Sequence, residues 1–195
     1  MQMVEPDADT VEARLLAGEI ACTGCGGELR PWGFARRRTV RDHRRPLRLR
    51  PRRSICRSCA VTHVLLPTVL VLRRKDVATV IGEALQGHLV SGATQEHVAE
   101  VAGAPVDTAR RWLRRFRANG PELREGFVAL AHRLDPELAP IVPRGLASPR
   151  RAGGDRGRRR GRRAPLRPRP LWLFVSGASG GRLLSNASCT VGASP

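Results

Sequence analysis

Two short cysteine motifs constrain this chain more than any other feature. Cys22-x-x-Cys25 and Cys56-x-x-Cys59 are separated by thirty residues, and arginine is the commonest residue between them. Four soft thiolates at this spacing can surround one tetrahedral Zn²⁺ ion. A thioredoxin-like redox motif would instead need a single CxxC within a βαβ unit, which the sequence does not predict. We therefore expect a structural zinc site with Cys22, Cys25, Cys56 and Cys59 as its ligands.

One further donor follows the second pair. His63 lies four residues after Cys59 and offers a substitute ligand. Because four thiolates already complete a tetrahedron, we interpret His63 as a surface or phosphate-contacting histidine. A structural site of this kind leaves no open coordination position, so the metal indicates binding rather than catalysis.

The charge balance narrows the class of partner. The chain has 195 residues, a formal net charge of +18 and a pI near 11.7. Such an excess favours phosphate-bearing polymers, with duplex DNA as the expected partner and no small-molecule substrate. No apolar run approaches the ~20 residues that span a bilayer, and the acidic first residues are unlike a secretory signal. We expect a cytoplasmic, nucleoid-associated protein without a membrane partner.

The first part of the sequence predicts a short helix followed by a zinc ribbon. Residues 1–19 contain a helix over 11–16 with Asp9 or Thr10 as its cap, and residues 20–72 contain the ribbon and a connector. The chain is predicted to be extended over 28–41 and 47–55, because Leu47 and Leu49 alternate with arginine and prolines flank them. The apolar stretch 64–72, which Pro67 interrupts, is interpreted as the connector.

The second part predicts an all-α helix-turn-helix domain over residues 76–135. A helix is expected over 76–86, and Gly87 and Gly92 flank the turn after it. Thr94 is the predicted cap of the next helix, Gly103 ends it, and a further helix runs from 106 to 116. A separate helix is expected over 121–134. The predicted fold class is therefore small α+β, with a β-hairpin and a four-cysteine zinc site at the N-terminus.

Arginines supply the expected contacts with DNA. From 108 to 118 there are five arginines and no acid, whereas a merely solvated helix face would mix both charges. The alternative is an ordinary helical core in a chain whose GC-rich coding sequence favours arginine. The predicted contacts are Val106, Asp107, Arg110, Arg111 and Arg114 toward the major groove, Arg115 and Arg117 toward phosphate, and Arg48, Arg50 and Arg52 on the ribbon.

The last part, residues 141–195, is predicted to be an Arg-rich, largely disordered tail. Residues 150–169 hold ten arginines and one acid, interspersed with Gly and Pro. The tail either adds non-specific affinity or is the frame-shifted end of a decayed mobile-element gene. The apolar stretch 171–175 is expected to dock as a short strand or to remain without order.

Several motifs in order carry a family resemblance. These are Cys22-x-x-Cys25-Gly-Gly, Trp32-Gly33, an Arg-rich hairpin, Cys56-Arg-Ser-Cys59, and the segment ending Arg111-Trp-Leu-Arg-Arg-Phe116. Over about residues 15–134 the chain resembles uncharacterised zinc-ribbon and helix-turn-helix proteins of high-GC bacteria. That family is similar to the DNA-recognition ends of insertion-sequence transposases. The resemblance implies the same four cysteine ligands, and Thr23 stands where a proline often follows the first cysteine.

The expected function is therefore zinc-dependent, non-enzymatic DNA binding, as a transposase-related DNA-recognition protein or a transcriptional regulator. The alternatives are an RNA- or ribosome-associated zinc ribbon, or a truncated transposase remnant. A complete transposase would need three separated carboxylates within a mixed α/β nuclease fold. No strand pattern surrounds the acids after the predicted helix-turn-helix, which are Glu122, Glu125, Asp135, Glu137 and Asp155. The absence of tyrosine excludes a tyrosine recombinase.

Overall fold

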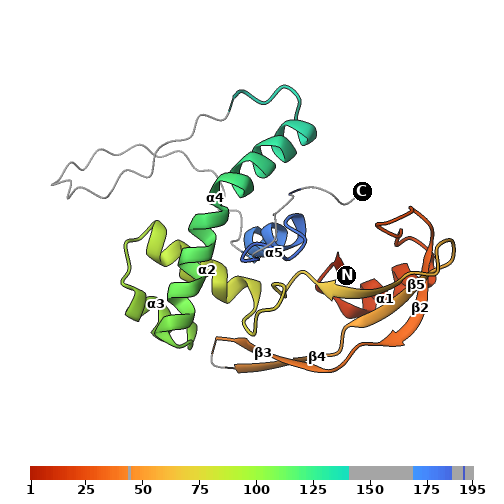
Figure 1. Ribbon diagram of the computed structural model, residues 1–195, viewed down its shortest axis with the longest axis horizontal. Helices are drawn as coiled ribbons and strands as arrows, with labels where there is room; N and C mark the ends of the chain where they lie inside the picture. Colours follow the sequence, from red (N-terminus) through yellow and green to blue (C-terminus); the bar gives the residue numbers. More distant parts are fainter. Residues whose placement is uncertain (44, 141–168, 186–190, 192–195) are drawn as a thin grey trace.

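The computed structural model describes residues 1–43, 45–140, 169–185 and 191 (Figure 1). Within these residues the protein has a small α+β architecture, as expected, with a β-sheet region followed by helices. Strands β1 (Gln2–Val4), β6 (Thr62–Pro67), β5 (Arg52–Cys56) and β2 (Leu29–Phe34) form one sheet in that order, and β3 (Arg38–Asp42) pairs with β4 (Arg45–Leu49). The helices are α1 (Ala8–Leu16), α2 (Ala78–Leu89), α3 (Gln95–Ala102), α4 (Val106–Leu134) and α5 (Arg169–Ala178).

The first helix starts earlier than predicted. Asp7, rather than Asp9 or Thr10, caps α1, and its carboxylate accepts a hydrogen bond from the Thr10 amide at 2.8 Å. Val11 and Leu15 of α1 are buried against the sheet in a small core that includes Cys22 and Cys56. This core therefore places the first cysteine of each pair inside the protein.

Residues 62–67 form a strand, although we predicted that 64–72 would be a connector. β6 pairs with β5 in antiparallel and with β1 in parallel orientation. Leu65 belongs to the small core around the cysteines, whereas Leu66 belongs to the larger core around the helices. A strand that is buried on both faces is apolar throughout and loses the alternation by which strands are recognised.

The hairpin of β3 and β4 has the predicted alternation. Leu47 and Leu49 pack against the helical core, whereas Arg48 and Arg50 are exposed. The hairpin extends from the sheet region to the helices in Figure 1. The backbone of Arg41 forms hydrogen bonds with the residues before and after Asp76. Its amide donates to Lys75 O at 2.6 Å, and its carbonyl accepts from the Val77 amide at 3.0 Å.

The helices agree with the predicted caps but not with all of the predicted bounds. The Thr94 hydroxyl accepts from the His97 amide at 3.2 Å, and Gly103 ends α3 with a φ of 64°. α2 begins two residues later than predicted, and it continues through Gly87 to Leu89.

The two predicted helices 106–116 and 121–134 are one continuous helix, α4, with Pro121 inside it. A residue with a Cβ before proline disfavours helical backbone, but the preceding residue here is Gly120. Contacts with the rest of the protein hold α4 just before and just after Pro121. Asn119 donates hydrogen bonds to Leu183 O and Ser185 O, and the Leu123 side chain is buried. Tertiary contacts thus offset the hydrogen bond that Pro121 cannot make.

The predicted disorder of 141–195 does not hold for its described part. Residues 141–168 lie outside the described residues, but α5 packs beside α2 (Figure 1), and Leu183 and Leu184 are buried. The Trp172 ring lies against the backbone of α2 at Gly82, where a Cβ would be 2.0 Å from a ring carbon. The expected short strand is a helix because its apolar residues cover a helical core rather than a sheet edge.

Candidate functional site

The four cysteines converge on one point. All four sulfur atoms lie within 4.8 Å of one another, and they belong to Cys22, Cys25, Cys56 and Cys59. The Cys22 and Cys59 sulfurs are 3.9 Å apart, and those of Cys25 and Cys56 are 3.5 Å apart. Cys22 and Cys56 are buried, and Cys25 and Cys59 are exposed. The arrangement can hold a metal ion at the edge of the sheet, as the sequence predicted.

Each pair adopts the same tight turn. The Gly26 amide donates to Cys22 O at 2.8 Å, and the Ala60 amide donates to Cys56 O at 3.1 Å. Both donors have left-handed backbone, with φ of 73° at Gly26 and 59° at Ala60. In each pair the left-handed residue directly follows the second cysteine and closes the turn, and both sulfurs of the pair belong to the cluster. Two equivalent turns facing each other therefore create the cluster.

Gly27 allows the two turns to approach each other. A Cβ at this position would lie 2.3 Å from the Ser58 hydroxyl oxygen and 3.1 Å from the Cys56 sulfur. Any side chain here would separate the cysteine pairs. The Gly-Gly that follows the first pair is thus part of the site.

The environment makes the four thiols unequal. Hydrogen bonds from the amides of Cys59 and Ser58 lower the pKa of Cys56 to about 6, although burial opposes them. The Gly27 amide acts to lower the pKa of Cys25, but bonds to the sulfurs of Cys56 and Cys59 raise it to about 12. These opposite shifts mean that Cys25 holds its proton more tightly than Cys56 does. A metal ion would displace that proton.

His63 occupies a different environment from the predicted one. It is only 6% exposed, so its interpretation as a surface or phosphate-contacting residue is wrong. Its Nε2 lies 3.3 Å from the Cys22 sulfur, and its buried Nδ1 has no hydrogen-bond partner among the residues that the structure describes. Burial lowers the pKa of His63, and so does the nearby N-terminal amine. His63 therefore contacts the cluster from within the sheet. Its spacing from Cys59 was the only signal in the sequence.

The predicted DNA-contacting residues of α4 fall into three environments. Asp107, Arg110, Arg111, Arg114 and Arg117 are exposed and Arg115 is half-buried. Val106 packs against the helical core, so it does not point outward with them as predicted. Arg110 is bound to neighbouring polar groups, with its guanidinium 3.0 Å from Gln95 Oε1 and 3.4 Å from Glu96 and Asp107 carboxylate oxygens.

The arginines of the ribbon also differ from one another. Arg48 and Arg50 are exposed, and the Arg50 guanidinium carbon lies 4.9 Å from the centre of the Phe34 ring. The Arg52 side chain is 15% exposed and binds both carboxylate oxygens of Glu12 at 2.6 and 2.9 Å. It also donates to Gly33 O at 2.7 Å. Arg52 therefore joins α1 to the sheet, a role that replaces its predicted contact with phosphate.

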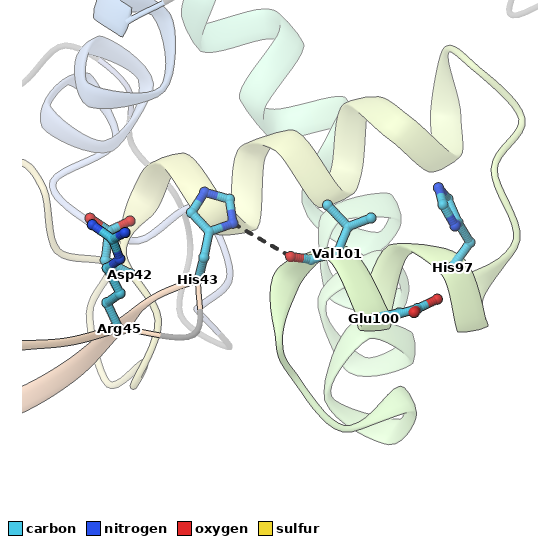
Figure 2. Close-up of a pocket in the computed structure, with 6 residues that line it drawn as sticks. All are labelled: Asp42, His43, Arg45, His97, Glu100 and Val101. Carbon is cyan, nitrogen blue, oxygen red and sulfur yellow. Dashed lines mark hydrogen bonds between the residues drawn. The ribbon is translucent and has the colours of Figure 1, made fainter.

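The tip of the β3–β4 hairpin meets α3 at an open hollow of about 550 Å³. Figure 2 shows the His43 ring directed toward the Val101 carbonyl, with His97 and Glu100 further along α3. His43 Nδ1 is 3.5 Å from Val101 O, and its Nε2 is 3.3 Å from a Glu83 carboxylate oxygen. These contacts, which the sequence did not predict, hold the hairpin beside α2 and α3.

The comparisons with known proteins show which segment of the chain matches a protein family, but they assign no activity to it. A family model described as a domain of unknown function (DUF6431) matches residues 22–112, which is less than half of the 195-residue chain. The match includes both cysteine pairs, α2, α3 and the start of α4. No curated protein and no solved structure matches the chain. Among the described residues, no helix combines the length and apolar character needed to cross a membrane.

Proposed function

We propose that this protein binds duplex DNA without catalysing a reaction, and that Zn²⁺ stabilises its N-terminal half as a zinc ribbon. In this proposal α3, the turn at Gly103 and α4 act as a helix-turn-helix. The observation that carries it is the exposed arginine face of α4 beside the turn. The role is that of a nucleoid-associated DNA-recognition protein, related to the recognition regions of insertion-sequence transposases or acting as a transcriptional regulator.

Zinc is favoured by the chemistry of the donor set. Four cysteine sulfurs within 4.8 Å of one another suit a soft ion with tetrahedral coordination. Four protein ligands leave no position for water or substrate, so the ion would have a structural role. The core beside it is small and includes two of the cysteines themselves, so metal binding would supply much of the folding free energy of this half.

The helix-turn-helix assignment is supported by the packing of three helices. Val98, Ala99 and Ala102 of α3 are buried, and Ala109 and Trp112 of α4 are buried with them in the core that α2 completes. Small residues at the crossing let the two helices approach closely. The outward face of α4 is left to arginine, which can donate two hydrogen bonds to guanine.

Arg114 is the best candidate for reading a base. It is exposed, and among the described residues it has no hydrogen-bond or ion-pair partner, whereas Arg110 is held by Gln95, Glu96 and Asp107. Arg110 would have to exchange these partners for DNA. We therefore assign direct base contact first to Arg114 and a positioning role to Arg110.

The hairpin would supply a second contact with the DNA backbone. Arg48 lies on β4 and Arg50 just after it, and both are exposed. The ion pair between Arg41 and Asp76 fixes the hairpin to the turn before α2. The two arginine surfaces, one formed by the exposed arginines of α4 and the other by Arg48 and Arg50, are therefore held in a fixed position relative to each other. A bound duplex would contact the two surfaces together, and this would increase affinity without adding base specificity.

The decisive experiment measures binding of the zinc-loaded full chain to duplex DNA over a series of salt concentrations. We expect the affinity to fall steeply with salt, with a slope of about −0.9 per phosphate neutralised. Affinity that is insensitive to salt would overturn the proposal. Structured RNA is added as a competitor in a second arm, and preferential binding of RNA would assign the protein to the RNA-associated class instead. Incubation with labelled duplex and Mg²⁺ or Mn²⁺ tests for strand cleavage, which we do not expect.

A further inference from the structure

Three arginines converge where the turn before α2 meets α4. Arg74 lies in that turn, and Arg111 and Arg115 are one helical turn apart on α4. Burial lowers the pKa of the Arg74 guanidinium, and the positive charges of Arg115 and Arg111 lower it further, whereas the carboxylate of Asp76 acts in the opposite direction. The geometry agrees, because Arg74 and Asn119 of α4 both bond to backbone carbonyls within residues 183–185, and Arg115 lies one helical turn before Asn119. Three like charges therefore lie in one region.

The protein uses only part of the hydrogen-bonding capacity of this cluster. Arg111 Nε donates to Asp107 O at 3.1 Å, and Arg74 donates through one terminal nitrogen. The Nε atoms of Arg74 and Arg115 are buried and have no acceptor within the part of the chain that the structure describes. Among the described residues, none of the three arginines forms an ion pair with a carboxylate. Buried donors without acceptors and unneutralised charges both cost free energy. A ligand that accepts hydrogen bonds and carries negative charge would satisfy both deficits.

Backbone contacts fix one side of the cluster. Arg74 donates to Leu184 O, and the Asn119 side-chain amide donates to Leu183 O and Ser185 O at 3.1 Å each. Asn119 follows Arg111 and Arg115 on the same stripe of α4, at intervals of four residues. The segment after α5 therefore holds Arg74 against α4, and exposed Arg111 forms the open side.

We propose that Arg74, Arg111 and Arg115 form a binding site for one phosphate group. Planar guanidinium groups bind phosphate oxygens in pairs, and phosphate offers enough acceptors and charge for three of them. This inference moves Arg111 from base reading to phosphate binding and adds Arg74, which lies outside the predicted helix-turn-helix. The phosphate belongs either to the DNA backbone, in which case the inference rests on the proposed DNA binding, or to a free phosphate compound.

The first arm of the test uses inorganic pyrophosphate and the zinc-loaded full chain. We expect pyrophosphate, but not chloride at the same ionic strength, to raise the melting temperature. Arg115→Gln should abolish this shift and should melt no lower than the parent without pyrophosphate, because it relieves charge repulsion. Arg115→Gln is preferred to Arg74→Gln, because Arg74 also anchors Leu184. The matched control is Arg124→Gln, which changes an exposed arginine further along α4.

The second arm repeats the salt series with duplex DNA. If the site holds a backbone phosphate, Arg115→Gln reduces the salt slope by about 1, whereas Arg124→Gln leaves it unchanged. If pyrophosphate raises the melting temperature only when Arg115 is present, and the protein does not bind DNA, the site is one for a free phosphate compound. That result overturns the proposed function. DNA binding with the same slope in both variants, and no pyrophosphate shift, overturns the site and leaves the proposed function standing.

Discussion

His63 Nε2 lies 3.3 Å from the Cys22 sulfur, and this histidine of β6 is buried. In this position its N–H can donate to the Cys22 thiolate and fix the direction of the sulfur lone pairs. Such a partner of a metal ligand contributes to metal affinity without touching the ion.

We expect His63→Ala to weaken Zn²⁺ binding by about 10–100-fold, as measured by competition with a chromogenic chelator. His63→Gln should recover part of the affinity, because its amide can also donate a hydrogen bond. His97→Ala, at an exposed position on α3, is the control and should bind Zn²⁺ like the parent. Equal affinity in His63→Ala would mean that the histidine only fills space.

Metal binding should release protons, and its apparent affinity should rise with pH. The pKa of about 12 at Cys25 means that this thiol is protonated at neutral pH, whereas Cys56, with a pKa of about 6, is already largely ionised. A ligating Cys25 must lose its proton, so raising the pH favours the metal-bound state. Titration of the zinc-free protein at several pH values, in buffers of different ionisation enthalpy, measures the protons released.

Removing the metal should unfold the sheet region before the helices. Cys56→Ser and excess chelator should both reduce the β signal in circular dichroism, while most helical signal remains. Ser58→Ala, next to the same ligand, is the control and should keep its zinc. A chelated protein with an unchanged spectrum and melting curve would show that the cluster needs no metal to hold its shape.

The ion pair between Arg41 and Asp76 should matter for stability. Its two hydrogen bonds are 2.7 and 3.1 Å long, and the Asp76 side chain is 3% exposed whereas that of Arg41 is 37% exposed. We expect Asp76→Asn to lower the free energy of unfolding by about 1–3 kcal/mol, because it leaves buried hydrogen-bonding groups poorly matched. Asp42→Asn, at an exposed neighbour, should change it by less than about 0.5 kcal/mol. Chemical denaturation measures both.

Variants of the two arginine surfaces should separate specificity from affinity. We expect Arg114→Ala to reduce discrimination between a selected duplex and a scrambled one by about 1–3 kcal/mol. Arg48→Ala should weaken binding to both duplexes equally, because a phosphate contact carries no sequence information. Selection of bound duplexes from a random pool supplies the preferred sequence. If both variants lowered the two affinities by the same factor, the division of roles would be wrong.

The parts of the structure that the sequence predicted are those determined by neighbouring residues. The cysteine cluster depends on two local turns, and the bounds of α3 depend on Thr94 and Gly103, which act within their own helix end. The alternation of Leu47 and Leu49 with arginine identified the exposed face of the hairpin in the same way. Each turn, helix end and strand face is decided by chemistry within a few residues, and the spacing of the two cysteine pairs indicated that the two turns come together.

The parts that were missed depend on contacts distant in sequence. β6 is a strand because β1 and β5 lie beside it, and Arg52 is held by Glu12. The spacing of His63 from Cys59 does not indicate which side of the sheet the histidine faces, so its contact with Cys22 could not be predicted. The continuity of α4 through Pro121 depends on partners around residue 184. No local propensity contains this information.

The position of α5 near the C-terminus affects the order in which parts of the protein can fold during synthesis. Ser176 closes a buried hydrogen bond to Leu70 across a separation of 106 residues, and the Leu72 amide bonds to Gly181 O at 2.8 Å. A ribosome adding ~5–20 residues per second needs roughly 5–20 s to produce that separation. The cysteine turns can close on a metal soon after they leave the exit tunnel, whereas the surface of α2 that Trp172 covers must wait. During that interval the nascent chain exposes this apolar surface of α2, and a chaperone that recognises apolar surface could bind there.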